Sequence, residues 1–250
     1  MDAVSIVIIT RNEAHNITDC IRSALKVSSD IIVVDSGSTD DTVSLATRAG
    51  AKVITIQWAG FGAARNTGSV NALHDWVLAI DADERISDAM VAAVALCRLD
   101  NDRIIYGFRR QSYFLGQKIR FGSWGRDSVY RLYNRNRVSW DLSAVHEQLT
   151  GTDTTTKMLK GIIDHYTVTS EAENYEKTNR YAALSAEKYF NQGKRATIIK
   201  RFVSPVFEFV KSYFVLLGFL DGKPGYIIAR SSAHYIALKY SLLYQLYKRA

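Results

Sequence analysis

The chain has 250 residues, of which 47% are hydrophobic, and its formal net charge at neutral pH is +7. This hydrophobic content supports a substantial folded core, which excludes a disordered chain. The only cysteines, Cys20 and Cys97, lie in apolar, helix-like patterns, which excludes a disulfide framework and a zinc or redox motif and indicates a reduced, cytoplasmic protein.

The first eighty residues alternate between strand-like and helix-like segments. Apolar, β-branched runs that we expect to be strands cover residues 4–9, 31–34, 52–56 and 76–80. Residues 17–25 space their apolar side chains as one helix face does, and a second helix is expected from a cap at Asp40 to Gly50. The first run has no basic region before it and is too short for a signal peptide. The alternation predicts an α/β fold with a mostly parallel sheet flanked by helices.

Beyond residue 83 the regular alternation stops. Ser87 is expected to cap a helix through Leu99, and strand-like segments predict a mixed extension of the same sheet at residues 104–108, 128–133 and 162–166. Ser170 and Glu173 form a capping box that opens a helix ending near Gly193. We therefore expect an α/β domain over residues 1–168 and a helical region over residues 169–250.

The basic charge is concentrated in the last quarter of the chain. Residues 1–185 contain 21 Lys+Arg and 22 Asp+Glu, a net charge of −1, whereas residues 186–250 contain 11 and 3, a net charge of +8. The apolar segments 202–220 and 226–247 in this quarter are rich in aromatic residues and interrupted by charges, so a simple spanning helix is not expected. The pattern favours an anionic membrane surface and not nucleic acid as the partner. The alternative is a helical hairpin packed on the domain or on a second subunit, as in a homodimer.

Polar clusters follow the predicted strands, at the sheet edge where ligands of parallel sheets bind. Asp81 and Asp83 end the fourth strand, and their oxygens suit Mg2+ or Mn2+, although Asp-x-Asp after a strand also occurs as a turn or a helix cap. Asp35 ends the second strand, where it either binds a nucleoside or closes an Asx-turn. The segment after the first strand lacks the glycines of a dinucleotide-binding fold, which disfavours a dehydrogenase.

Four stretches together resemble the family 2 glycosyltransferases, which have the GT-A fold of nucleotide-diphospho-sugar transferases. They are VSIVIITRNE at residues 4–13, VVDSGSTDDT at 33–42, GAARNTG at 62–68 and DADE at 81–84. The resemblance covers roughly the first 150 residues. The later VHE at 145–147 and the GFLDG turn at 218–222 resemble the branch that adds glucose, in a β-1,4 linkage, to the inner core of bacterial lipopolysaccharide.

The resemblance implies roles for residues of the nucleotide-sugar-binding half, residues 1–100. Thr10, Glu13, Asp35, Arg65 and Asp81 are expected to bind the nucleotide sugar, with Asp35 suited to the N3–H of uracil. Asp83 is expected to bind Mg2+ or Mn2+. For Arg65 the alternative is a salt bridge at a helix end.

Further roles fall in the acceptor half, residues 101–168. Glu147 is expected to be the catalytic base, and His146 beside it to bind the acceptor or orient the carboxylate; because the family often has Glu-Asp here, the base position is open between these two residues. His165 is a second candidate metal ligand, or else a histidine satisfied inside the sheet. Trp124 is expected to stack on an acceptor sugar, or else to belong to the core.

The resemblance implies an inverting, metal-dependent glycosyltransferase that moves a hexose, glucose from UDP-glucose, to a lipid-linked saccharide such as the lipopolysaccharide inner core. The helical region is expected to hold it on the inner face of the cytoplasmic membrane. A Gln-x-x-Arg-Trp stretch, typical of processive synthases, does not occur, which favours transfer of one sugar. The alternatives are a sugar nucleotidyltransferase, which needs a glycine-rich basic loop after the first strand, and a non-catalytic membrane adaptor.

Overall fold

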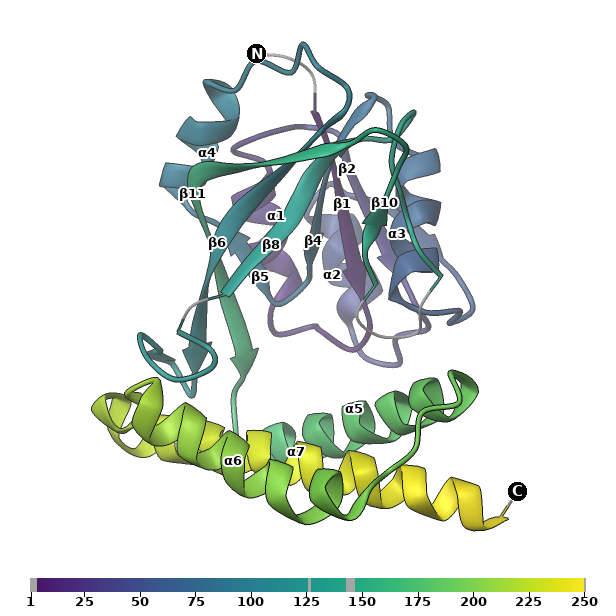
Figure 1. Ribbon diagram of the computed structural model, residues 1–250. Helices are drawn as coiled ribbons and strands as arrows, with labels where there is room; N and C mark the ends of the chain where they lie inside the picture. The colour runs from purple at the N-terminus through teal and green to yellow at the C-terminus, as the bar shows by residue number, and fades with distance from the viewer. Residues whose placement is uncertain (1–3, 126, 143–146, 250) are drawn as a thin grey trace. The chain divides into compact units, whose positions relative to one another are not determined.

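The computed structural model describes residues 4–125, 127–142 and 147–249, and it separates into two compact units (Figure 1). The first unit comprises residues 1–110 and 128–165, and the second comprises residues 111–127 and 166–250. The expected division at residue 168 placed residues 111–127 with the acceptor half, whereas in the structure they cluster with the C-terminal helices.

The first unit begins with the predicted alternation of strands and helices. The strands are β1 (Val4–Thr10), β2 (Ile31–Asp35), β3 (Lys52–Thr55) and β4 (Trp76–Asp81), and the helices between them are α1 (Ile17–Ala24), α2 (Thr42–Arg48) and α3 (Phe61–Val70). The pairs β1–β2, β2–β3 and β1–β4 are parallel. The predicted parallel sheet is therefore confirmed.

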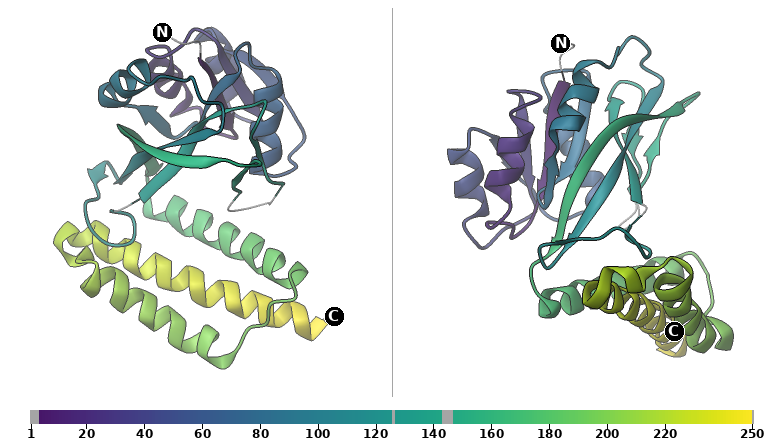
Figure 2. Two further views of the ribbon diagram at one scale, coloured as in Figure 1. Left: turned by 45° about the horizontal axis from the view of Figure 1, so that its top comes forward. Right: turned by 90° about the vertical axis from the view of Figure 1, so that its left-hand side faces the viewer.

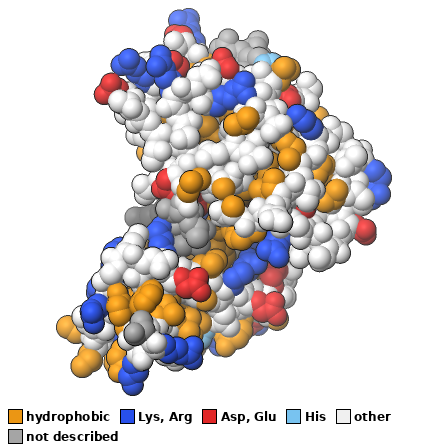
Figure 3. All heavy atoms as spheres, turned by 90° about the vertical axis from the view of Figure 1, so that its right-hand side faces the viewer, with side chains coloured by type: hydrophobic (Ala, Val, Ile, Leu, Met, Phe, Trp, Pro, Cys, Tyr) orange, Lys and Arg blue, Asp and Glu red, His pale blue; other side chains and the backbone are white. Residues whose placement is uncertain are grey.

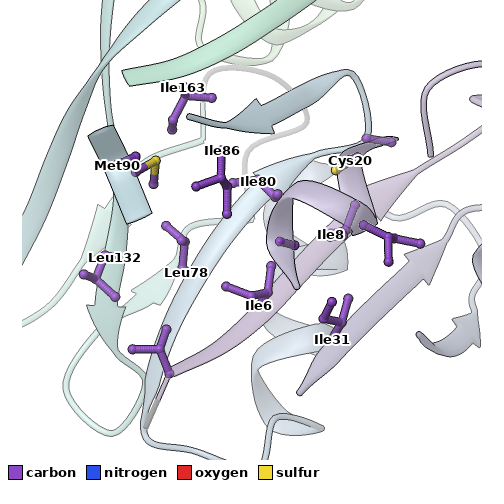
Figure 4. Close-up of a cluster of buried hydrophobic side chains, with 14 of the residues drawn as sticks. Ile6, Ile8, Cys20, Ile31, Leu78, Ile80, Ile86, Met90, Leu132 and Ile163 are labelled. Atoms are coloured by element: carbon purple, nitrogen blue, oxygen red, sulfur yellow. The ribbon is translucent and has the colours of Figure 1, made fainter. Parts of the chain in front are cut away.

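Strands β1 and β2 are buried along their whole length because both faces of the sheet are covered there, whereas the edge strand β3 is exposed at both ends (Figure 2). Successive side chains of a strand point to opposite faces. Ile6 and Ile8 face a cluster with α1, α2 and helix α4 (Asp88–Ala95), which Figure 4 shows in close-up. Val7 and Ile9 face a second cluster that includes Ala64 of α3. The two clusters fix which side chains of each strand face which helices.

The sheet continues with antiparallel strands, as predicted for the mixed extension. The further strands are β5 (Glu84–Ile86), β6 (Ile104–Phe114), β7 (Gln117–Lys118), β8 (Asp127–Asn134) and β11 (Thr155–Val168), and the order is β3-β2-β1-β4-β8-β6-β11-β5 with β7 beside β6. The pairs β4–β8 and β5–β11 are antiparallel. A separate hairpin joins β9 (Ser139–Trp140) to β10 (Leu149–Thr150).

Several helix and strand boundaries differ from the predicted ones. Asp41, not Asp40, is the N-cap of α2, while the Asp40 carboxylate accepts a hydrogen bond from the backbone N–H of Thr42 at 3.1 Å. Ser87 caps α4 as predicted, but the helix ends at Ala95. Strands β6 and β11 extend beyond the predicted segments, and the first four residues of β11 are exposed.

The second unit is mainly helical. It contains α5 (Glu171–Asn191), a π-helical turn η1 (Ile199–Val203), α6 (Ser204–Val210), a second π-helical turn η2 (Lys211–Val215), a 3-10 turn η3 (Gly218–Asp221) and α7 (Gly222–Arg249). Ser170 caps α5 as predicted. The Glu173 side chain accepts from the N–H of Thr169, one residue before the position that a capping box uses.

Helix α7 is the packed helix of this unit. It contacts both α5 and α6, and Ile227 and Ile228 join the core formed with Phe114, Ile119 and Val168. The Asp221 carboxylate accepts hydrogen bonds from the N–H groups of Arg120 and Phe121, which ties the loop after β7 to the turn before α7. Of the two apolar segments in the sequence, residues 226–247 therefore lie in the packed helix α7, and residues 202–220 form an exposed segment before it.

Among the described residues, no individual helix has the length and apolar composition to cross a bilayer; only the bent pair Ile199–Val215 and Gly218–Arg249, at 69°, meets those two criteria jointly.

Candidate active site

The carboxyl ends of three neighbouring strands bring three of the predicted site residues to one edge of the sheet. Thr10 of β1 is in register with Asp35 of β2, and Ile9 is in register with Asp81 of β4. The buried Thr10 hydroxyl has no hydrogen-bond partner within the described ranges. A buried hydroxyl without a partner costs free energy, so it is available to a ligand at this edge.

The loops after β1 and β2 are joined to each other. The N–H of Asn12 donates to Ser38 Oγ at 2.8 Å, and the N–H of Thr39 donates to Asn12 Oδ1 at 2.8 Å. Asp35 closes an Asx-turn: its Oδ2 accepts from the N–H groups of Gly37 and Ser38, both at 3.0 Å, and its Oδ1 accepts from the Ser38 hydroxyl. A carboxylate has about four acceptor positions, so about one remains for a ligand.

Glu13 lies in the turn between β1 and α1. Its N–H donates to Thr42 Oγ1 at 2.8 Å, and its carboxylate accepts from the Asn16 amide at 2.9 Å. These contacts hold the side chain beside the joined loops.

Arg65 of α3 connects two carboxylates that are far apart in the sequence. Its Nη2 lies 2.5 Å from Asp81 Oδ1, and its Nη1 contacts Glu147 Oε1. The guanidinium is 2% exposed and stacks over the Trp140 ring at 4.6 Å. The predicted donor-binding Arg65 and the predicted base Glu147 are therefore brought together. Arg65 also forms salt bridges, as its alternative role requires.

The β9–β10 hairpin places Glu147 beside α3. The Asn66 side chain donates to the backbone oxygen of Trp140 at 2.8 Å and accepts from its N–H at 2.9 Å. The N–H of Asp141 then donates to the oxygen of Gln148 at 2.9 Å, which returns the chain next to Arg65. Local sequence gives no indication of this arrangement, because it depends on contacts more than seventy residues apart.

Arg131 of β8 and Glu84 of β5 were not among the predicted site residues. Arg131 Nη2 lies 3.0 Å from Asp81 Oδ2 and 3.4 Å from Glu84 Oε1, and Arg110 approaches Glu84 Oε1 at 3.3 Å. Glu84 Oε2 also accepts from the N–H of Asp81 at 3.0 Å. The available signal was an arginine among the apolar residues in the middle of a predicted strand, because a buried charge requires a partner.

Electrostatics in this network favour the ionised carboxylate at Asp81. Burial alone would raise the pKa of Asp81, but the guanidinium groups of Arg131 and Arg65 outweigh it and lower that pKa well below its usual range. Burial likewise would lower the pKa of Arg131, and the carboxylates of Asp81 and Glu84 raise it instead. The neighbouring thiol of Cys20 has a raised pKa because it is buried and faces the same carboxylates.

Asp83 and His165, the two predicted metal ligands, are neighbours. Asp83 Oδ2 lies 3.4 Å from His165 Nε2, and both side chains are largely buried. The residues that the structure describes contain no cluster of three or more His, Cys, Asp or Glu side chains arranged for a metal ion. In the network beside this pair, the carboxylates of Glu147, Asp81 and Glu84 contact the guanidinium groups of Arg65, Arg131 and Arg110.

The three carboxylates of that network are balanced by its three guanidinium groups. The Asp83 carboxylate therefore adds a net negative charge beside the network. One carboxylate and one imidazole fit a divalent cation that takes its remaining ligands from phosphate and water.

Of the two predicted acceptor residues, only Trp124 lies within the part of the chain that the structure describes. Trp124 belongs to the second unit, where its ring meets Phe114 edge-on at 5.8 Å and packs on the core of that unit. His146 lies outside the described residues.

Comparisons with known proteins agree with the geometry of the first unit. The family model described as "Glycosyl transferase family 2" matches residues 5–152. An uncharacterized glycosyltransferase of Rickettsia prowazekii is 30% identical over 246 residues, which cover 91% of this chain and 82% of the relative. The lipopolysaccharide core biosynthesis glycosyltransferase LpsC of Rhizobium meliloti is 29% identical over 250 residues, which cover 97% and 92%.

Solved structures resemble the chain less closely. Glucosyl-3-phosphoglycerate synthase from Mycobacterium tuberculosis, in complex with Mn2+, UDP-glucose and phosphoglyceric acid, is 26% identical with a TM-score of 0.36 and covers 44% of each chain. TarS from S. aureus is 16% identical with a TM-score of 0.45 and covers 99% of this chain and 91% of its own.

Apart from residue 4, the family match includes all four stretches singled out in the sequence, and it extends through β10. The parallel strands β3-β2-β1-β4, with helices on both faces and an antiparallel extension, form the predicted GT-A fold. The chain therefore belongs to glycosyl transferase family 2.

Proposed function

We propose that this glycosyltransferase is an inverting, metal-dependent enzyme that moves a hexose, glucose from UDP-glucose, to a lipid-linked saccharide of the lipopolysaccharide inner core. The observation that supports it most directly is the clustering of Asp83, His165, Asp81, Arg65 and Glu147 in one unit, at the edge where sheets of this kind bind ligands. The similarity to LpsC supports the acceptor class. The enzyme would work in the cytoplasm, on the inner face of the cytoplasmic membrane.

The residues at the sheet edge suit a nucleoside diphosphate. Thr10 offers its unpartnered hydroxyl, and Asp35 retains about one acceptor position for the uracil N3–H. Asp83 and His165 would hold Mg2+ or Mn2+. A divalent cation bound there would neutralise negative charge on the departing diphosphate.

We assign to Glu147 the role of the base that removes the proton of the acceptor hydroxyl. Arg65 engages Oε1, which orients the carboxylate and leaves Oε2 to accept the proton of the acceptor hydroxyl. Direct displacement at the anomeric carbon needs one base and no covalent nucleophile, so the product would have inverted configuration. Arg65 also contacts Asp81, which links the positions of the base and of the donor pocket.

The donor class is tested by thermal shift with a panel of nucleotide sugars, with and without Mn2+. A ligand at one hundred times its Kd adds about 2.7 kcal/mol to the free energy of unfolding. We expect the largest shift for UDP-sugars with Mn2+, and its loss in Asp83→Ala and His165→Ala. Asp75→Ala, at an exposed carboxylate, is the control.

Product analysis separates the rival functions. A glycosyltransferase releases UDP when the lipid acceptor is supplied, a sugar nucleotidyltransferase releases pyrophosphate, and a non-catalytic adaptor releases neither. A product of retained anomeric configuration would contradict the proposed displacement.

A further inference from the structure

The segment before α7 exposes a continuous apolar surface. Between Phe202 and Leu220 eleven residues are exposed, and ten of them are apolar: Phe202, Val203, Val206, Phe207, Val210, Phe214, Val215, Leu217, Phe219 and Leu220. Phe207 is 65% exposed and Val215 is 69% exposed. Side chains of this size are seldom exposed in such number along one segment unless something covers them. Figure 3 shows hydrophobic side chains gathered with Lys and Arg side chains on one face of the helical unit.

The exposed residues repeat every four positions, at Ile198, Phe202, Val206, Val210 and Phe214. In an α-helix of 3.6 residues per turn, each step of four advances the side chain by about 40°, so four steps would turn the row by about 160° around the helix. Such a row would leave any flat surface within three turns.

The two π-helical turns correct this drift. The N–H of Ser204 bonds to the oxygen of Ile199, and the N–H of Leu216 bonds to the oxygen of Lys211 at 2.8 Å, each five residues back. A π turn holds more residues than an α turn, so a step of four falls short there. With η1 and η2 on either side of α6, the apolar residues stay on one side of the segment, and we call this surface the apolar stripe, residues 198–220.

Basic residues accompany the apolar stripe. Residues 194–223 contain six Lys+Arg and two Asp+Glu, a net charge of +4. Lys194, Arg195, Lys200, Lys211 and Lys223 are exposed. Glu208 is paired with Lys211 at 3.6 Å, and Asp221 accepts backbone hydrogen bonds, so both acids are already engaged.

We propose that the apolar stripe inserts into the headgroup region of an anionic phospholipid bilayer, with α6 lying in the plane of the membrane and α7 remaining packed behind it. This inference rests on the proposed function, because a lipid-linked acceptor requires access to a membrane surface. Apolar residues in one row beside basic residues are typical of helices that lie in the interface. A second copy of the chain is a weaker occupant, because a symmetric contact would bring two segments of net charge +4 together.

The test is flotation of the full-length protein with vesicles of phosphatidylethanolamine and phosphatidylglycerol, compared with vesicles of phosphatidylcholine. We expect binding to the anionic vesicles that weakens with added salt. The variant Val206→Glu/Phe207→Glu should bind at least tenfold less well. Leu96→Glu, at an exposed leucine of the first unit, is the control and should bind as the wild type does. Lys194→Gln and Lys200→Gln should each lower the affinity about fivefold.

Three results would overturn the proposal: no binding by the folded wild type, unchanged binding by Val206→Glu/Phe207→Glu, or a wild-type dimer that this variant dissociates. Wild-type protein that resists extraction by high salt and carbonate would indicate a spanning segment instead. The thermal shift with UDP and Mn2+ is measured on each variant, since it reports folding and donor binding without a membrane. In the wild-type protein, a thermal shift without flotation would contradict docking alone, and flotation without a thermal shift would contradict the proposed function alone.

Discussion

Arg65 and Arg131 hold the charged side chains of the site in a defined arrangement. Both are nearly fully buried, and between them they contact Asp81, Glu84 and Glu147. Removing charges from water costs several kcal/mol per ion, so a buried network of this kind contributes orientation more than net stability. Its Arg–carboxylate contacts keep Glu147 in place and leave Asp83 beside His165.

Glu147→Gln tests the assignment of the base. The amide keeps the size of the side chain but cannot take a proton, so turnover should fall by ~10²–10⁴-fold, measured as UDP release with the lipid acceptor. The thermal shift with UDP and Mn2+ should stay as in the wild type. Glu187→Gln, on the exposed side of α5, is the control. Unchanged turnover would remove Glu147 from the mechanism.

Arg131→Met tests the network itself. In this variant the fully buried Glu84 keeps its ion pair with Arg110 but loses the one with Arg131. Asp81 loses one of its two guanidinium partners. Loss of one partner of a buried ion pair typically costs 3–5 kcal/mol, and we expect roughly that loss in urea unfolding. Arg137→Met removes a surface pair with Asp102 and should leave the urea midpoint close to the wild-type value. Equal midpoints for the two variants would contradict a structural role for Arg131.

Among the elements, α3 positions the site because it packs very closely on the sheet. A Cβ atom at Gly68 would lie 2.3 Å from Val7 Cγ1 and 3.1 Å from Val34 Cγ2. Gly68 lies in the motif that contains Arg65, so the missing side chain brings that arginine to the edge of the strands. The close packing of α3 on the sheet and the position of Arg65 at the site therefore depend on the same stretch of sequence, residues 62–68.

Gly68→Ala measures this packing. Alanine is favoured over glycine in a helix by about 1 kcal/mol, whereas overpacking of a core typically costs 1–3 kcal/mol. Because the contact at 2.3 Å is with a side chain inside the sheet, we expect the clash to win and the free energy of unfolding to fall. Val70→Ala, at an exposed position of the same helix, should be nearly neutral. A Gly68→Ala protein more stable than the wild type would contradict the packing argument.

The chain as a whole divides its proposed tasks between two cores. The first unit has two apolar clusters on the faces of the sheet, and the second has its own cluster around Phe114 and Ile227. Residues 111–127 join the second unit through local contacts within it, such as the hydrogen bond from the N–H of Gly122 to the oxygen of Leu216 at 2.9 Å. The nucleotide sugar and the membrane, the two proposed ligands, would therefore each bind to a unit that has its own hydrophobic core.

Hydrogen exchange measured by mass spectrometry should follow this division. UDP with Mn2+ is expected to slow exchange in the loops at residues 10–13, 35–39 and 81–84, while anionic vesicles slow it over residues 198–220. Buffer alone and vesicles of phosphatidylcholine are the controls. Protection by vesicles centred on the sheet loops would contradict the assignment of the membrane surface to the second unit.

Much of the first unit follows from short-range patterns. The apolar β-branched runs predict β1 to β4, and the hydroxyls of Ser87 and Ser170 predict one helix start in each unit, because both patterns are formed by residues close together in the chain. The motifs at residues 4–13, 33–42, 62–68 and 81–84 were sufficient to predict the family and the sheet edge that bears the site.

Tertiary contacts decided the rest. Glu147 meets Arg65 across 82 positions, Arg131 meets Asp81 across 50, and α7 becomes a packed helix only because α5 and α6 lie against it. Local periodicity reports which face of an element is apolar, but it contains no information on which distant element covers that face or neutralises a buried charge. That information exists only after the chain has folded, when burial makes an unpaired charge costly enough to select its partner.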